Sequence, residues 1–119
     1  MGTVYRGTQL AVQRPVAIKV LRPHVPEQDK PALVERFRRE ALATSRLRHP
    51  NTVSVYDFGE TDDGVLYMVL ELLEGKTLSA VIRESAPLPA ERVAAIGRQI
   101  AKSLAEAHAC GIVHRDLKP

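Results

Sequence analysis

The sequence predicts an α+β fold, with a sheet in the first half of the chain and helices in the second. Val16–Leu21 is a β-branched run typical of a strand. Thr61-Asp62-Asp63-Gly64 contains Asp-Gly between two further apolar runs, which favours a hairpin. The later part of the chain has apolar residues at helical spacing: Val93, Ile96, Ile100, Leu104 and Ala107.

The elements of the first half follow from local patterns. A connection follows the first predicted strand, because three prolines occur there: Pro23, Pro26 and Pro31. A helix is predicted over Leu33–Leu47, where one stripe contains Leu33, Phe37, Glu40, Thr44 and Leu47. Pro50 ends this segment, and Thr52–Phe58 and Val65–Leu70 are the next predicted strands.

The second half reads as helical. Gly75 interrupts the strand pattern, and Leu78–Ile82 is predicted to be a short helix. Pro87 and Pro89 mark the start of the long helix, which ends at Gly111. We therefore expect a hinge near Gly75 between two lobes.

Composition excludes several classes of protein. The 119 residues are 45% apolar and 26% charged, which are globular values, and a net charge of +3 with 4% aromatic residues argues against nucleic-acid binding. The single Cys110 excludes an internal disulfide and a cysteine metal cage. No apolar run approaches the ~18 residues of a membrane span, and the first residues lack signal-peptide features, so we expect a cytoplasmic protein without a membrane segment.

Lys19 and Glu40 are charged residues at positions where apolar ones are expected. In a strand, Lys19 shares a face with Ala17 and Leu21, and it either protects a sheet edge or meets an anion. Glu40 either pairs with a buried cation or reaches solvent beside Arg36 or Arg39. If strand and helix pack together, we expect Lys19 and Glu40 to pair within ~4 Å, unless the helix is rotated or swung away.

Two further segments attract attention. His114-Arg115-Asp116-Leu117-Lys118-Pro119 places a carboxylate between cations, which suits a group that orients a hydroxyl and accepts its proton; the alternative is a charged, solvated segment. Gly2-Thr3-Val4-Tyr5-Arg6-Gly7 has a glycine before a short β-branched segment, which is weak alone.

Together these segments resemble a protein kinase domain. The resemblance rests on motifs in the family's order: Val16-Ala17-Ile18-Lys19, Phe37-Arg38-Arg39-Glu40, His49-Pro50-Asn51, Met68-Val69-Leu70-Glu71 and His114–Pro119. A lysine at position 118 is typical of the catalytic loop of serine/threonine kinases rather than that of tyrosine kinases. The segments Val53–Gly59 and Leu72–Gly75 are most similar to those of bacterial members of the eukaryotic-type family. The resemblance implies a kinase small lobe with hinge over 1–74 and the start of the large lobe over 75–119.

The resemblance also implies roles for residues. Gly2 matches the last glycine of the phosphate loop, Val4 and Ala17 would line the adenine pocket, and Leu70 matches the residue that guards its back. Backbone groups of Glu71 and Leu73 would form hydrogen bonds with the adenine. Lys19 would hold the ATP phosphates while paired with Glu40. Asp116 would be the catalytic base, and Lys118 would contact the γ-phosphate.

The same resemblance defines the expected activity and its limits. It implies a kinase that transfers the γ-phosphoryl group of ATP, with magnesium, to Ser/Thr of protein substrates. The family's first strand and first two glycines would lie before Met1, and its metal-binding asparagine and D-F-G aspartate after Pro119. We therefore expect a fragment without metal ligands that is inactive alone. The alternatives are a non-catalytic remnant that binds nucleotide or a partner, and an unrelated α+β scaffold.

Overall fold

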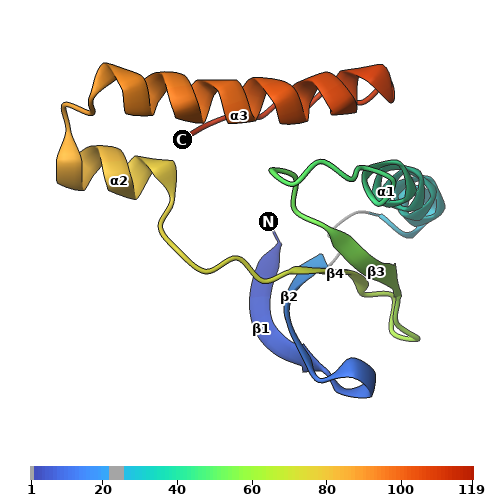
Figure 1. The fold of residues 1–119 in the computed structure, drawn as a ribbon. Helices are drawn as coiled ribbons and strands as arrows, with labels where there is room; N and C mark the ends of the chain where they lie inside the picture. Colours follow the sequence, from blue (N-terminus) through green and yellow to red (C-terminus); the bar gives the residue numbers. More distant parts are fainter. Residues whose placement is uncertain (1, 22–25) are drawn as a thin grey trace. The chain divides into compact units, whose positions relative to one another are not determined.

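The computed structural model describes residues 2–21 and 26–119, and Figure 1 shows its ribbon. Strands and one helix come first, and two helices follow: β1 (Thr3–Gln9), β2 (Arg14–Leu21), α1 (Lys30–Thr44), β3 (Val55–Glu60), β4 (Leu66–Glu71), α2 (Leu78–Ser85) and α3 (Ala90–Ala109). Short 3₁₀ turns cover Leu10–Val12 and Glu27–Asp29. This order confirms the predicted α+β class.

The chain divides into two compact units. The first contains the residues up to Leu47 together with Val53–Leu73, and the second contains Arg48–Thr52 with Glu74–Pro119. The sheet and α1 thus belong to the first unit, and α2 and α3 to the second. Residues 48–52 join the second unit although α1 and β3, their neighbours in the chain, belong to the first.

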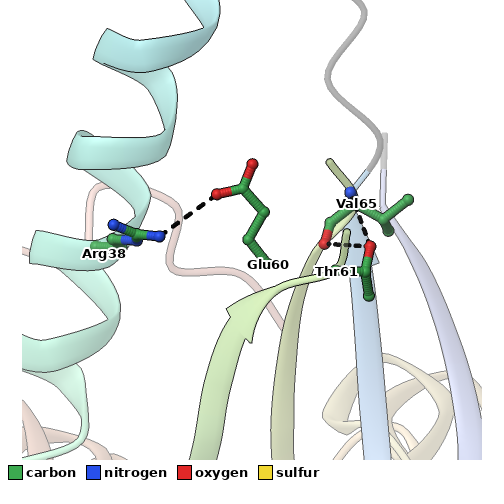
Figure 2. Close-up of polar contacts among 4 residues, drawn as sticks. All are labelled: Arg38, Glu60, Thr61 and Val65. Atoms are coloured by element: carbon green, nitrogen blue, oxygen red, sulfur yellow. Dashed lines mark hydrogen bonds and ion pairs between the residues drawn. The ribbon is translucent and has the colours of Figure 1, made fainter. Parts of the chain in front are cut away.

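The described strands form a four-stranded antiparallel sheet in the order β1-β2-β4-β3. The β3–β4 turn confirms the Asp-Gly signal, because Gly64 has a φ of 78° and its N–H donates to the Thr61 carbonyl oxygen at 2.8 Å. The Thr61 hydroxyl oxygen accepts a hydrogen bond from the Val65 N–H at 3.1 Å and lies 3.3 Å from the Val65 carbonyl oxygen, which closes the turn (Figure 2). Figure 2 also shows the ion pair of Arg38 on α1 with Glu60 at the end of β3, at 3.5 Å.

Several predicted boundaries move. Helix α1 starts at Lys30, ahead of the predicted Leu33, because Pro31 fits the first turn of a helix, where a missing N–H costs nothing. Strand β3 starts at Val55, after the predicted Thr52, because residues 48–52 form a separate turn. Strand β1 was not predicted, because its sequence lacks a strong apolar alternation. The predicted connection at Pro23 lies outside the described residues.

The core of the first unit is small. Val16 in β2 and Leu66 in β4 are 1% and 2% exposed, and α1 buries Phe37 and Ala41. The predicted stripe placed Glu40 on this face, but Glu40 is exposed and its neighbour Ala41 is buried. The helix is rotated so that a methyl group, rather than a carboxylate, enters the core, since an unpaired buried charge is costly.

The helices of the second unit have defined ends. The Thr77 hydroxyl accepts a hydrogen bond from the Ala80 N–H at 3.2 Å and caps α2. After α3, Gly111 has a φ of 74°, which suits glycine, and its N–H donates to the His108 carbonyl oxygen at 2.9 Å. Among the helices of the described chain, none combines the length and apolar character needed to cross a membrane.

Candidate nucleotide and phosphotransfer site

The sheet register gathers four of the predicted site residues on one face. Lys19 lies opposite Val4 of β1, and Ala17 lies opposite Leu70 of β4. Directly opposed residues of antiparallel strands point to the same side, and so do residues two apart in a strand. Val4, Ala17, Lys19 and Leu70 therefore share a face, and the same register adds Arg6, opposite Ala17, and Met68, opposite Lys19. Val4 is 62% exposed, so this face of the described unit is open at its β1 edge.

Gly2 precedes β1 at a point where the backbone passes close to β2. A Cβ atom at this position would lie 2.9 Å from Leu21 Cδ2 and 3.1 Å from the Val20 carbonyl oxygen. A larger residue would require the Leu21 side chain to move and the Val20 backbone to shift by a few tenths of an ångström. The glycine at this position is thus explained by a close approach of two backbones.

Lys19 and Glu40 do not pair in this structure. Glu40 Oε1 instead accepts a hydrogen bond from Arg36 Nε at 2.9 Å, four residues earlier on α1. Within residues 2–21 and 26–119, no ion pair joins Lys19 to an acidic side chain. The predicted pair is therefore absent from this conformation, and the alternative, Glu40 in solvent beside Arg36, is the one observed. The cause is the rotation of α1 that buries Ala41.

The end of β4 and the residues after it offer backbone groups rather than side chains. The Glu71 N–H donates to the Ser54 carbonyl oxygen at 2.9 Å, and the Glu71 carboxylate accepts from the Ser54 N–H at 3.2 Å. Glu71 lies opposite Val16, so its side chain is on the sheet face away from Lys19. Since its N–H is already used, a purine contact at Glu71 has to be accepted by the carbonyl oxygen. Leu73, two residues later, is 65% exposed.

Asp116 and Lys118 lie together in the second unit. Lys118 Nζ is 2.8 Å from Asp116 Oδ2, and both side chains are exposed. The hydrogen bond from Lys118, followed by its charge, lowers the pKa of Asp116 below the ordinary value of 3.8. Between His114 and Asp116, Arg115 has a φ of 61°, an unusual value for a residue other than glycine, and the Asp116 N–H donates to the His114 carbonyl oxygen at 2.8 Å. Asp116 is thus an ionised acceptor on a tight turn.

Side chains of the kinds that ligate metals do not cluster in the described residues. These residues contain no group of three or more His, Cys, Asp or Glu side chains able to hold a metal ion. The Asp116 carboxylate is engaged by Lys118.

A contact that the sequence did not reveal holds the turn at residues 48–52 on α3. The Glu106 carboxylate accepts hydrogen bonds from the Arg48 N–H at 2.9 Å and the His49 N–H at 3.0 Å. These hydrogen bonds lower the pKa of Glu106 below the ordinary value of 4.5. The nearest signal in the sequence is a stripe of polar residues at i, i+4 and i+7 on the long helix, of which Glu106 is the last. Such a polar stripe normally faces solvent, so it did not indicate a contact.

Comparison with known proteins identifies the family of this chain. The protein kinase domain family matches residues 1–119. Serine/threonine-protein kinase pkn3 of Myxococcus xanthus is 43% identical over all 119 residues, and serine/threonine-protein kinase PrkC of Bacillus subtilis is 44% identical over the same length. Serine/threonine-protein kinase PknL of Mycobacterium tuberculosis is 42% identical over 117 residues, or 98% of this chain. The chain spans 21%, 18% and 29% of the lengths of these three relatives.

Proposed function

This chain belongs to the protein kinase domain family, and we propose that the full-length protein containing it is a serine/threonine protein kinase. The reaction is transfer of the ATP γ-phosphoryl group to Ser or Thr side chains of proteins. One observation carries the proposal: Val4, Ala17, Lys19 and Leu70 share one face of the sheet. Family membership implies ATP and a divalent metal ion as well.

The shared face suits a nucleotide because its two kinds of groups match the two ends of ATP. Val4, Ala17 and Leu70 offer apolar surface for the adenine ring. The Lys19 ammonium group offers a charge for the α- and β-phosphates. Glu71 is the last residue of β4 and Leu73 lies two residues later, and we assign the hydrogen bonds to the adenine edge to the Glu71 carbonyl oxygen and the backbone of Leu73. Gly2 allows the start of β1 to lie close to the phosphates.

Asp116 and Lys118 supply the groups for transfer. An ionised Asp116 accepts a hydrogen bond from the substrate hydroxyl, orients it, and takes its proton as the new O–P bond forms. The bond between the γ-phosphorus and the bridging oxygen breaks, and ADP leaves with the electron pair. Lys118 stabilises the charge on the transferred group, which requires it to leave Asp116 Oδ2. Glu40, once turned to Lys19, would hold that ammonium group in place. We derive no step through magnesium, because the described residues contain no cluster of metal-ligand side chains.

Three substitutions in the full-length protein test these roles. Asp116→Asn is expected to lower the initial phosphorylation rate by roughly 10²–10⁴-fold and to leave ATP affinity nearly unchanged. Lys19→Met is expected to weaken both ATP affinity and rate, and Lys118→Ala mainly the rate. Asp62→Asn, an exposed carboxylate in the β3–β4 turn, is the matched control and should behave as wild type.

The assay measures initial rates with a Ser/Thr-containing protein substrate and ATP affinity by calorimetry. Near wild-type turnover in Asp116→Asn would remove Asp116 from the mechanism. ATP binding without any turnover in the wild type would favour the non-catalytic alternative.

A further inference from the structure

Two stacked side chains, here called the Arg14–Tyr56 stack, lie at the end of β4. The Cζ atom of Arg14 is 3.4 Å from the centroid of the Tyr56 ring. Arg14 is the first residue of β2 and Tyr56 belongs to β3, and β4 lies between these two strands (Figure 1). The Arg14 side chain therefore reaches across β4 to its partner.

The register places this crossing where β4 ends. Val16 lies opposite Glu71, and the described β2–β4 pairing stops at these two residues. Arg14 comes two residues before Val16, so it lies beside the residues that follow Glu71. Side chains alternate along a strand, which puts Arg14 on the sheet face opposite that of Lys19. The stack thus holds the chain from behind, at the point where the ladder with β2 no longer does.

The contacts of the guanidinium group favour this stacked position. Arg14 Nη2 donates to Gln9 Oε1 at 2.6 Å, and Gln9 lies opposite Arg14 in the β1–β2 pair. Arg14 Nε is buried and has no hydrogen-bond partner among the described residues. The cation is therefore partly withdrawn from water, which strengthens its attraction to the ring. The planar guanidinium group can stack on the ring, whereas a lysine would offer only a point charge.

Two hydrogen bonds attach the same end of β4 to the segment before β3. The Glu71 N–H donates to the Ser54 carbonyl oxygen at 2.9 Å, and the Ser54 N–H donates to the Glu71 carboxylate at 3.2 Å. Ser54 is two residues before Tyr56 in the chain. The stack and these hydrogen bonds therefore act on one short stretch of backbone.

We propose that Arg14 is a positioning residue, which holds the end of β4 through its stack on Tyr56 and so places the backbone groups of Glu71 and Leu73. These groups carry the proposed hydrogen bonds to adenine, so the inference rests on the proposed function. A displaced backbone would weaken the adenine contacts equally in bound ATP and in the transition state. The expected signature is a higher KM for ATP with kcat nearly unchanged.

The test compares variants of the full-length protein in steady-state kinetics. Arg14→Met keeps an unbranched side chain but removes the charge and the planar group, and Tyr56→Leu removes the ring. We expect each to raise the KM for ATP by about threefold to tenfold, the order of a partly buried cation–π contact, and to change kcat by less than about twofold. Tyr56→Phe keeps the ring and should behave as wild type. Arg46→Met makes the same change as Arg14→Met at an exposed position and is the matched control.

The double variant Arg14→Met/Tyr56→Leu isolates the contribution of the stack. If the two residues act through each other, its KM for ATP should be no higher than that of the more affected single variant. Multiplied effects would mean that the residues act independently and would overturn the proposal. A lower kcat at unchanged KM would overturn it too.

Amide hydrogen exchange measures the attachment of β4 without any catalysis. We expect exchange at Ser54 and Glu71 to be about threefold to tenfold faster in Arg14→Met and in Tyr56→Leu, because their N–H groups hold the end of β4. Gly64, whose N–H closes the turn before the other end of β4, should exchange as in wild type.

The exchange data separate a local role from a general one. Unchanged exchange at Ser54 and Glu71 would overturn the positioning role, and so would an equal acceleration at Gly64, since that would show a general loss of stability. An inactive wild type would overturn the proposed kinase function, whereas the exchange data would still decide whether Arg14 holds the end of β4.

Discussion

Replacing Arg36 by alanine tests whether Glu40 is free to change partners. In this structure Arg36 Nε and Glu40 Oε1 are 2.9 Å apart, and the two side chains are 66% and 61% exposed. The proposed function needs Glu40 on Lys19 instead. The question is how strongly the present partner holds it.

The geometry gives a small magnitude. An exposed i,i+4 ion pair contributes about 0.3–0.5 kcal/mol, and the order with the cation before the acid is the less favourable one. At an RT of about 0.6 kcal/mol, losing 0.4 kcal/mol changes a partner equilibrium by roughly twofold. Arg36 is therefore a weak competitor, and the rotation of α1, rather than this ion pair, decides where Glu40 points.

The assay is the initial phosphorylation rate of the full-length protein at limiting ATP. We expect Arg36→Ala to change kcat/KM by no more than about twofold, with any change upward, because one competitor for Glu40 is removed. Arg39→Ala, at an exposed position on the same helix, should behave as wild type. Glu40→Gln should reduce kcat/KM much more, since it removes the charge that is proposed to hold Lys19.

A tenfold loss in Arg36→Ala would refute this reasoning. It would mean that the Arg36–Glu40 pair itself serves the reaction. Equal losses in Arg36→Ala and Arg39→Ala would point instead to a general requirement for basic charge on α1.

Three further predictions concern stability and pH. Gly59→Ala should destabilise the protein by about 1–3 kcal/mol, because the new Cβ would lie 2.8 Å from Tyr67 Oη and 3.0 Å from its ring. Gly97→Ala on α3, with open space around it, should stabilise the protein by about 0.5–1 kcal/mol. Chemical denaturation measures both changes, and equal effects would contradict the contact with Tyr67. Leu66→Ala should cost about 2–5 kcal/mol in the same assay because Leu66 is almost completely buried, and a loss below 1 kcal/mol would argue against this core. Because the pKa of Glu106 is lowered on folding, the stabilisation from its carboxylate is complete above the ordinary value of 4.5 and is lost as pH falls through the lower value. In the wild type, the protection of the Arg48 and His49 amides from hydrogen exchange, corrected for intrinsic rates, should be constant from neutral pH to about 5 and disappear at lower pH. In Glu106→Gln, the protection of these amides should not depend on this titration.

The local elements could be predicted from the sequence because their signals depend on residues a few positions apart. The β-branched run of β2, the Asp-Gly turn before β4 and the apolar period of α3 each appear in the structure close to their predicted places. The period of a strand is also enough to place Ala17 and Lys19 on one face. The hexapeptide ending at Pro119 singled out Asp116 and Lys118 as candidate site residues by type and spacing, and the structure adds their ion pair.

Other features required the tertiary structure because they depend on how distant segments align. Val4 and Leu70 join the face of Lys19 only through the register of three strands, which no single strand's pattern contains. The rotation of α1 was mispredicted by one position, because Glu40 and Ala41 both fit a broad helical stripe and only packing shows which one is buried.

The contact between Glu106 and the 48–52 turn shows the limit most clearly. Glu106 reads in the sequence as a solvated helix residue, and its two N–H partners are backbone groups, which every residue except proline possesses. The sequence by itself determined the other elements, their order and the chemical types of the proposed site residues, since these depend on neighbouring side chains, but it did not determine β1, which lacks a strong apolar alternation. The tertiary structure alone decided the partners of Glu40 and Glu106, since hydrogen bonds between distant segments depend on their arrangement in space and leave no period in the sequence.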